Sequence, residues 1–436
     1  MPPSTLLSPR PAQRAGVPRP SRLIPHRLVC RECGADYPAA PTAVCEACLG
    51  PLEPRYDPGR RLPTREEIAA RAPSLWRYRE WLPFTGEPRH SLDTGFTPLF
   101  EAPALADRLG VARAWIKNDA VSHPTLSFKD RVVAVAINAA AAFGCETIAC
   151  ASTGNLANAV AAHAARAGLE AWIFVPEDLE PAKISASVVY GARVVRVRGT
   201  YDDVNRLCSQ VADRFGWGVV NVNLRSYYGE GSKTVAFEIA EQLGWRLPTA
   251  VVAPMAGGSL VTKLAKGFRE FLAAGLVGGP APRLFGAQAE GCAPIVRALR
   301  PGEEIVIRPE VPKTIARSLA IGNPADGLSA ARAIRESGGA GIAVPDEAIR
   351  EGIAGLAQTA GVFTETAGGV TVAGAIFLGL AGELTPDDEV VLCITGNGLK
   401  TPDAVPARLL ETPVIAPRLA EVVGLAARES EFNSRI

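Results

Sequence analysis

Short apolar runs alternate with longer Ala-rich amphipathic segments from about Thr94 to Leu425. A short run rich in β-branched residues predicts a strand, and an amphipathic segment predicts a helix. The predicted strands are Trp115–Lys117, Thr147–Ala151, Ala171–Val175, Arg193–Val197, Ala250–Pro254, Arg283–Ala287 and Glu389–Ile394. Strands that alternate with helices are typical of a mostly parallel sheet covered by helices. The sequence therefore predicts an α/β protein.

Ligands of open α/β sheets bind where strands end in loops, so the loops that follow the predicted strands are the places to search. The loop Ser152-Thr153-Gly154-Asn155 places small hydroxyl groups and free backbone N–H groups at the start of a helix. Such a helix start binds anions and fits a carboxylate. The alternative is an ordinary N-capped helix.

Two further loops have the same position at a strand end. Ala256-Gly257-Gly258-Ser259-Leu260 has consecutive glycines that let the backbone wrap a phosphate, although it lacks the Lys-Ser/Thr of a nucleotide P-loop. In Thr395-Gly396-Asn397-Gly398-Leu399-Lys400, a neutral hydroxyl is suited to one hydrogen bond with a heterocycle nitrogen. The alternative for this last loop is a simple turn, which Asn-Gly favours.

A lysine stands at another strand-to-helix junction, in His123-Pro124-Thr125-Leu126-Ser127-Phe128-Lys129-Asp130-Arg131. Ser127 is a predicted N-cap, and an Ala- and Val-rich helix follows from Val132. The positive end of the helix dipole disfavours an ammonium group in the first turn, and a neutral amine is the form that attacks an aldehyde. Lys129 is thus a candidate Schiff-base lysine, with an ordinary surface lysine as the alternative.

Four of the nine cysteines form two CxxC pairs near the N-terminus. Cys30 and Cys33 are followed, after eleven residues, by Cys45 and Cys48. This spacing predicts a zinc ribbon, in which four thiolates surround one ion and leave no position open for catalysis. Disulfide pairing is the alternative, but the other five cysteines lie singly in apolar contexts, as expected in a reducing, cytoplasmic compartment.

Composition excludes several classes of partner. The 436 residues are 47% hydrophobic and 21% charged, with 46 basic and 45 acidic residues and a net charge of +1. A nearly neutral chain gives no electrostatic case for a nucleic-acid or membrane-surface partner. The longest uncharged segments are rich in Gly, Ala and polar residues, so no membrane span is predicted.

Residues 1–26 are rich in Pro and Arg and lack acidic residues, so they are predicted to form a disordered tail. A transit peptide is the alternative.

Taken in chain order, these segments resemble pyridoxal-phosphate enzymes of the tryptophan-synthase-β fold type, and among them the threonine synthases. The matching segments are Thr94–Leu99, Pro124–Arg131, Ser152–Asn155, Glu230–Thr234, Ala256–Leu260, Thr314–Ala316 with Gly322–Pro324, and Thr395–Lys400. The resemblance implies two open, mostly parallel sheets covered by helices. It also implies the domains 27–57 (ribbon), 58–122 with 226–425 (large, cofactor-binding), 123–225 (small) and 426–436 (C-terminal tail).

The same resemblance implies roles for individual residues. Lys129 would carry pyridoxal 5'-phosphate as a Schiff base and move protons at Cα and Cβ of the substrate. Asn155 would contact the cofactor's ring hydroxyl, and Thr395 its ring nitrogen. The cofactor phosphate would be bound by Gly257, Gly258, Ser259 and Leu260, the substrate carboxylate by Ser152, Thr153 and Gly154, and the substrate phosphate by Arg131, Lys117 or Lys233. For Lys117 and Lys233 a salt bridge is the alternative.

The implied reaction converts O-phospho-L-homoserine and water to L-threonine and phosphate, in an enzyme expected to be a homodimer. The alternatives are a serine/threonine dehydratase, a phosphoserine-using β-replacement synthase and, in another class, a zinc-ribbon regulatory or nucleic-acid-binding protein with a relict cofactor fold. The chain departs from the family pattern at His123 and Leu126, where Asn and Gly are usual, and at Phe96, where Asn is common. A titratable imidazole at His123 or a bulkier residue at Leu126, near the cofactor, would alter substrate preference; the alternative is that His123 caps a loop and Leu126 packs inward.

Overall fold

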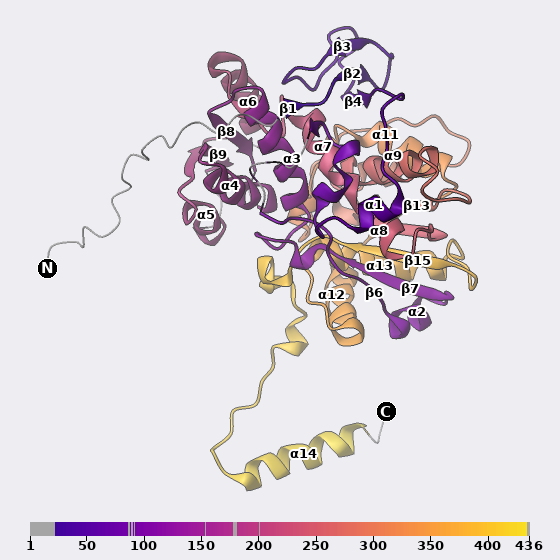
Figure 1. Cartoon of the computed structure of the whole chain (residues 1–436). Coiled ribbons are helices and arrows are strands. Elements are labelled where there is room, and N and C mark those ends of the chain that lie inside the picture. Colours follow the sequence, from indigo (N-terminus) through magenta and orange to yellow (C-terminus); the bar gives the residue numbers. More distant parts are fainter. Residues whose placement is uncertain are drawn as a thin grey trace, which may run out of the picture.

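A computed structural model describes residues 22–433 except 86–87, 89, 91, 153, 178–180 and 200, so the predicted tail at 1–21 lies outside the described residues. Two helix-covered sheets and a small ribbon make up the body of the protein (Figure 1). Within the described part of the chain, every helix is too short or too polar to traverse a lipid bilayer.

The larger sheet has six strands in the order β14-β13-β12-β15-β7-β6, and all neighbours are parallel except β6 and β7. Its strands are β6 (Leu99–Glu101), β7 (Arg113–Asn118), β12 (Ala250–Pro254), β13 (Arg283–Ala289), β14 (Gly341–Val344) and β15 (Glu389–Ile394). Its helices are α2 (Pro103–Leu109), α7 (Arg225–Ser232), α8 (Thr234–Gln242), α9 (Ser259–Ala273), α10 (Pro294–Arg297), α11 (Gly327–Glu336), α12 (Asp346–Ala360) and α13 (Thr366–Leu380). Because β15 lies between β12 and β7, the ends of these three strands meet at one edge of the sheet.

The smaller sheet has four parallel strands in the order β10-β9-β8-β11. They are β8 (Thr147–Ala151), β9 (Glu170–Pro176), β10 (Arg193–Val197) and β11 (Gly218–Val219). The helices of this part are α3 (Lys129–Ala142), α4 (Asn155–Ala167), α5 (Pro181–Val188) and α6 (Tyr201–Phe215). Helix α3 is buried from Asp130 to Ala140, which explains its Ala- and Val-rich sequence.

The ribbon is a three-stranded antiparallel sheet of β2 (His26–Cys30), β3 (Asp36–Pro38) and β4 (Leu52–Tyr56). Between the ribbon and the large sheet lie β5 (Phe84–Thr85), α1 (Arg65–Ala69) and the 3₁₀ helix η1 (Leu75–Trp81). The remaining 3₁₀ helices are η2 (Asp119–Val121), η3 (Glu290–Cys292), η4 (Arg317–Leu319), η5 (Gly398–Lys400), η6 (Pro402–Ala404) and η7 (Ala407–Leu409).

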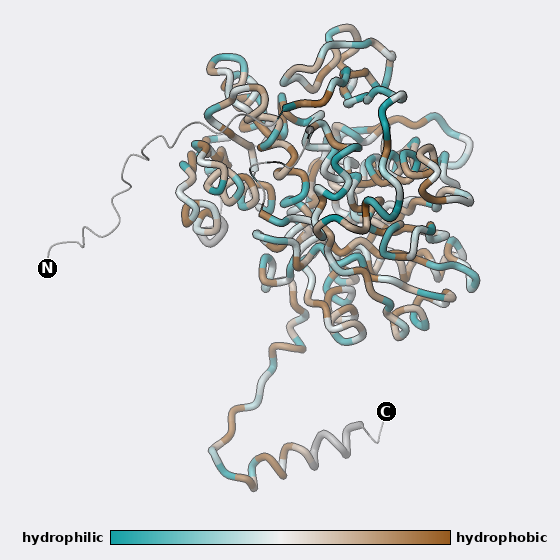
Figure 2. The backbone as a smooth tube through the Cα atoms, in the orientation of Figure 1, coloured by the Kyte–Doolittle hydropathy of each residue, from teal (hydrophilic) through white to brown (hydrophobic). Residues whose placement is uncertain are grey.

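All seven predicted strands are confirmed, whereas β6, β11 and β14 were not predicted because they are short. Two predicted boundaries need correction. Residues 22–26 were assigned to the tail, but β1 (Arg22–Leu23) pairs with β5, and the ring of His26 is buried. Residues 411–425 are predicted to belong to the large domain, but 411–418 are exposed and lead to α14 (Leu419–Asn433), which lies away from the body and has apolar residues in its first half (Figure 2).

A buried cluster of ion pairs fixes the position of α3. The Arg131 guanidinium binds the Asp119 carboxylate through Nε and Nη2 (both 2.7 Å) and the Glu238 carboxylate through Nη2 (2.8 Å) and Nη1. Lys117 Nζ also binds Glu238 (2.6 Å). Burial disfavours the charge of Glu238, but the charges of Arg131 and Lys117 outweigh burial and lower its pKa to about 2. The cluster therefore joins α3 to the end of β7 and to α8.

Leu126 and Phe96 have left-handed backbones, with φ of 59° and 48°. Leu126 accepts a hydrogen bond from the Asn397 N–H (3.1 Å) and donates its own N–H to the Ser122 carbonyl (2.8 Å). Gly and Asn, which the family usually has here, are the residues that tolerate this backbone best. Arg77 lies 4.3 Å from the centre of the Phe96 ring, an attraction that offsets part of the cost at that position.

We expect Arg131→Met to lower the free energy of unfolding by about 3–5 kcal/mol, because two buried carboxylates lose their partner. Urea unfolding measures this change. The stability of the wild type should also fall between pH 4.5 and 2, since a depressed pKa contributes stability above its unfolded value and loses it on protonation. The control Arg206→Met removes an exposed ion pair with Asp203 and should cost about 0.5 kcal/mol or less. A loss below about 1 kcal/mol for Arg131→Met would contradict the role of the cluster.

Leu126→Gly should raise the free energy of unfolding by about 0.5–1 kcal/mol, because glycine removes the left-handed penalty at a side chain that is 38% exposed. Leu126→Ala keeps that penalty and should bring no gain. Val121→Gly, at a nearby exposed residue outside the left-handed region, should lower stability by about 1 kcal/mol. Equal losses for both glycine variants in the same thermal or urea assay would show that the backbone of Leu126 carries no strain.

Candidate active site

Lys129 is the first residue of α3 and lies beside the loop that follows β15. The Phe128 N–H donates to the Thr395 carbonyl (2.8 Å), and Ser127 forms an antiparallel bridge with Gly396. The helix begins one residue later than predicted, with Phe128 at the N-cap position, although the Ser127 hydroxyl still accepts the Lys129 N–H (3.3 Å). Two of the predicted site segments are therefore joined by backbone hydrogen bonds.

The Lys129 amine donates a hydrogen bond to the hydroxyl of Tyr228 on α7 (2.7 Å). Tyr228 is 8% exposed, and its ring centre lies 5.4 Å from Nζ. Helix α7 comes this close to α3 because of Gly231, where an added Cβ would be 2.5 Å from the Arg131 carbonyl oxygen. No sequence pattern indicates Tyr228, since it lies 99 residues from Lys129 and no spacing rule connects them.

Asn155 begins α4 and points its amide at Glu365, the residue before α13. Asn155 Nδ2 donates to both carboxylate oxygens of Glu365, at 2.9 and 3.0 Å. Burial raises the pKa of Glu365, while the hydrogen bond from Asn155 and the charges of Lys400 and Lys129 oppose the rise. Burial in turn lowers the pKa of Lys400. Glu365 is a second residue that the sequence analysis missed.

Gly396 lies directly against Glu365, because a Cβ there would be 2.3 Å from Glu365 Oε1. The Glu365 N–H also donates to the Gly396 carbonyl (3.0 Å). Thr395 and Gly396 thus lie between the start of α3 and the start of α13. The predicted contact of Thr395 with a heterocycle nitrogen stays a prediction.

The loop between β8 and α4 keeps open space beside its backbone. An added Cβ at Gly154 would meet no atom within 4 Å, and the Gly154 N–H donates to the Ser152 hydroxyl (3.3 Å). Thr153 lies outside the described residues. The backbone at Gly154 is therefore open to approach, as the binding of a small anion at a helix start requires.

The loop Gly257-Gly258 precedes α9, which begins at Ser259 and continues through Leu260. Gly258 has a φ of 90°, and a Cβ on it would be 2.8 Å from Ala330 Cβ and 3.0 Å from the Asp326 carbonyl oxygen. A Cβ on Gly257 would meet only Ile321, at 3.9 Å. The loop is therefore packed against Asp326 on one side and open on the other, as a phosphate site at a helix N-terminus requires.

The three basic residues proposed for the substrate phosphate are not brought to Lys129. Lys117 and Arg131 belong to the buried cluster around Glu238, and Lys233 binds Glu230 (2.6 Å) and Glu270 (2.9 Å). All three side chains are at most 1% exposed. Lys117 and Lys233 form salt bridges, as the alternative interpretation predicts. These contacts give no support for a role of any of the three residues in binding the substrate phosphate.

The four ribbon cysteines gather as the CxxC spacing predicts. Their sulfur atoms all lie within 4.8 Å of one another, with Cys30 and Cys48 3.4 Å apart and Cys33 and Cys45 3.6 Å apart. Zinc–thiolate bonds of about 2.3 Å in a tetrahedron place sulfurs about 3.8 Å apart, so this cluster fits a zinc ion. The described cysteines are all free thiols, which opposes the disulfide alternative.

Comparisons with known proteins cover most of the chain. A family model described as "Pyridoxal-phosphate dependent enzyme" matches residues 90–396. A threonine synthase of Methanosarcina acetivorans is 36% identical over 87% of this chain and 93% of its own length. A threonine synthase of Methanocaldococcus jannaschii is 36% identical over 88% of this chain and 95% of its own length.

Solved structures share the fold at lower identity. Diaminopropionate ammonia lyase from Escherichia coli has a TM-score of 0.61 at 20% identity, over 79% of this chain and 93% of that one. Threonine deaminase isoform 2 from Solanum lycopersicum has a TM-score of 0.59 at 23% identity, over 70% of this chain and 79% of that one. The family match and the identity to the two archaeal relatives agree with the geometry around Lys129, and the chain belongs to the pyridoxal-phosphate dependent enzymes and, among them, to the threonine synthases.

Proposed function

We propose that this enzyme converts O-phospho-L-homoserine and water to L-threonine and phosphate, with Lys129 as the residue that holds pyridoxal 5'-phosphate. The observation that carries the proposal is the match to threonine synthases over nearly the whole chain. The position of Lys129 between the Thr395 loop and Tyr228 supports its role. When bound, the cofactor supplies a conjugated ring that takes up the electron pair left when Cα loses its proton.

The residues around Lys129 have separate tasks in this proposal. Gly257, Gly258, Ser259 and Leu260 bind the cofactor phosphate through backbone N–H groups at the start of α9, and Ser152, Thr153 and Gly154 bind the substrate carboxylate at the start of α4. Asn155, oriented by Glu365, contacts the cofactor ring hydroxyl. Thr395 gives one neutral hydrogen bond to the ring nitrogen and adds no charge there.

Lys129 and Tyr228 form the proton-handling pair. With substrate bound, the Lys129 amine would take the proton from Cα and pass it on; neutral again, it would take a proton from Cβ as phosphate leaves Cγ. The Tyr228 hydroxyl, 2.7 Å from Nζ, accepts a hydrogen bond from the amine and keeps it directed at the substrate. It also offers a second site for the proton while water adds at Cβ.

The ribbon cysteines are proposed to hold one structural zinc ion. Support comes from the sulfur spacing and from the four-thiolate ligand set, which suits zinc and leaves no open position. We further propose that the enzyme works in the cytoplasm, where reducing conditions keep its cysteines as thiols. A homodimer stays a prediction.

The substrate is tested by incubating the purified enzyme with O-phosphohomoserine, phosphoserine, threonine and serine separately, while phosphate, oxo-acid and the cofactor absorbance are followed. We expect threonine and phosphate from phosphohomoserine alone. Oxo-acid from threonine or serine would identify a dehydratase, and phosphate from phosphoserine with an added nucleophile would identify a β-replacement synthase.

Lys129→Ala should remove the Schiff-base absorbance, because the amine that binds the cofactor is lost. An unchanged spectrum would disprove the assignment of the lysine.

Tyr228→Phe should lower kcat by about 10²–10⁴-fold and change the pH profile of kcat, because the amine loses its hydrogen-bond partner. The Schiff-base absorbance should remain, since Lys129 is intact. Tyr227→Phe removes the neighbouring hydroxyl, which contacts His26 (3.2 Å), and serves as the matched control. If kcat of Tyr228→Phe stayed within about threefold of the control, Tyr228 would have no part in proton transfer.

Elemental analysis of enzyme purified without chelators should find about one zinc ion per chain. Cys33→Ser and Cys48→Ser should each lose the metal, whereas Cys145→Ser, outside the cluster, should keep it. Metal-free enzyme whose four ribbon thiols all react with a thiol reagent in the folded state would count against the zinc site.

A further inference from the structure

The ribbon is attached to α7 and α9, two of the helices that carry candidate site residues. On α7, the Ser226 hydroxyl lies 3.0 Å from the ribbon carbonyls of Thr42 and Leu52. His26 contacts the Tyr227 hydroxyl (3.2 Å) next to Tyr228. The ribbon is therefore bound directly to α7, the helix whose Tyr228 hydroxyl is hydrogen-bonded to Lys129.

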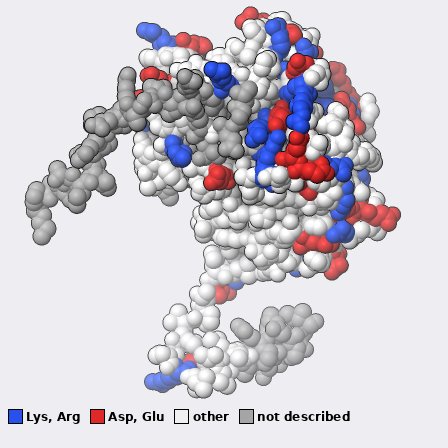
Figure 3. Space-filling view, in the orientation of Figure 1, with Lys and Arg blue, Asp and Glu red and all other residues white. Residues whose placement is uncertain are grey.

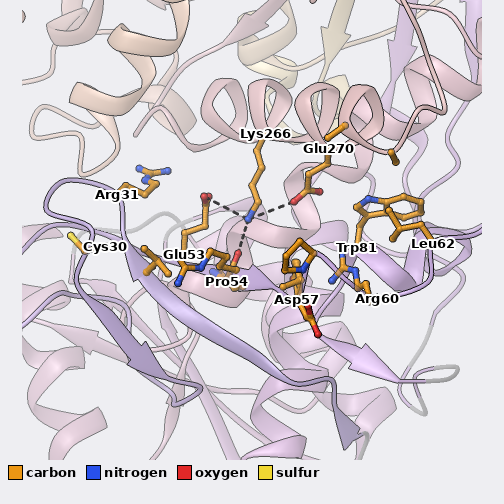
Figure 4. Close-up of a pocket in the computed structure, with 16 residues that line it drawn as sticks. Cys30, Arg31, Glu53, Pro54, Asp57, Arg60, Leu62, Trp81, Lys266 and Glu270 are labelled. Atoms are coloured by element: carbon orange, nitrogen blue, oxygen red, sulfur yellow. Dashed lines mark hydrogen bonds and ion pairs between the residues drawn. The ribbon is translucent and has the colours of Figure 1, made fainter.

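On α9, buried charges bind the ribbon strand β4. Lys266 Nζ donates to the Pro54 carbonyl (3.0 Å) and to Glu230 (2.8 Å), and it lies 3.6 Å from Glu53 and 3.9 Å from Glu270 (Figure 4). Of these residues, Lys266, Glu53, Pro54 and Glu270 line one wall of a cavity of about 500 Å³ between the ribbon and α9. On the face shown in Figure 3, basic and acidic side chains lie among one another, so the ribbon side presents no separate basic stripe. The ribbon thus meets the body through matched charges.

A third attachment reaches the glycine loop before α9. Arg31, between Cys30 and Cys33, has its N–H bound to the Pro51 carbonyl (3.1 Å) and its guanidinium bound to Asp326 (2.7 Å). Asp326 also binds Arg225 on α7. Burial disfavours the charge of Asp326, but the two arginines outweigh burial and lower its pKa. The carboxylate is therefore held charged between the ribbon and α7.

Asp326 in turn supports the glycine loop through its backbone. Its N–H donates to the Gly257 carbonyl (3.0 Å), and its own carbonyl oxygen lies 3.0 Å from the place where a Cβ on Gly258 would stand. Arg31, Arg225, Ser259 and Asp326 line a small cavity of about 20 Å³ between the ribbon and the start of α9. A shift of Asp326 would move the Gly257 carbonyl with it, because the two are hydrogen-bonded and Gly258 packs directly against the Asp326 backbone.

We propose that the four-cysteine ribbon is a positioning element for the cofactor phosphate, and that Arg31 acts through Asp326 to hold Gly257 and Gly258 in their binding conformation. The inference rests on the proposed function in one respect, namely that this loop binds the cofactor phosphate. It adds a role for the ribbon beyond structural support. Arg31 touches neither substrate nor cofactor, so it is a positioning residue.

Arg31→Gln in the full-length holoenzyme tests the proposal. The variant should raise the dissociation constant for pyridoxal 5'-phosphate about tenfold or more, because a hydrogen bond between charged groups is lost behind the loop. The constant is measured by titrating cofactor into stripped enzyme and following the Schiff-base absorbance, and the rate of cofactor loss from holoenzyme is measured on dilution. Neither readout uses a substrate, so a wrong substrate assignment would leave the result intact.

Glu32→Gln is the matched control, because Glu32 also joins the ribbon to the body, through Arg332 (2.7 Å), without touching Asp326. Its cofactor affinity should stay within about twofold of the wild type. Unchanged affinity in Arg31→Gln, or an equal loss in both variants, would overturn the proposal, since an equal loss would mean only that ribbon docking matters in general.

If Arg31→Gln fails to fold, Asp326→Asn takes its place, because it removes the charge that Arg31 binds while its backbone N–H still reaches the Gly257 carbonyl. The same weakening of cofactor binding is expected, and an unchanged dissociation constant would overturn the proposal. When both variants fold, the double variant should weaken binding no more than Asp326→Asn alone, since Arg31 acts through Asp326. Additive losses would show that Arg31 reaches the loop by another route.

Discussion

The arrangement of the active site depends on the buried ion pairs of Arg131. This guanidinium joins Asp119, which follows β7, to Glu238 on α8, and it lies two residues after Lys129. A buried charge is strongly destabilising unless it is paired. Any movement that separated Arg131 from its two carboxylates would therefore be costly, and this cost fixes their relative positions. The position of Lys129 is thus set by buried charges two residues further along α3, and its amine donates a hydrogen bond to Tyr228.

Strand order brings the remaining parts of the site together. Because β15 lies between β12 and β7, the glycine loop after β12, the Thr395 loop and the approach to α3 meet at one edge of the sheet. The small sheet contributes the start of α4, and the Asn155 amide bound to Glu365 connects it to the large one. Contacts between chain segments, rather than any single motif, therefore assemble the candidate site.

The sequence predicted the strands, the three loops and the cysteine cluster because each depends on residues close together in the chain. It did not predict Tyr228 or Glu365, since their partners lie far away and neither belongs to a pattern with a fixed spacing. It suggested a phosphate role for Arg131 because a basic residue in a motif looks the same whether it faces a ligand or a buried carboxylate. The left-handed backbones at Leu126 and Phe96 were hidden for a similar reason, as both residues ordinarily avoid that conformation.

The ion pair between Arg31 and Asp326 spans 295 residues, and this separation matters while the protein is being made. The ribbon leaves the ribosome first, but the helices and the carboxylate that it docks against are translated much later. At about 5–20 residues per second, the ribbon waits for roughly 15–60 seconds without its partners. During that interval the ribbon is stabilised only by its own strands and its four-cysteine cluster. The cysteines therefore stabilise the nascent chain before the ribbon docks in the folded enzyme.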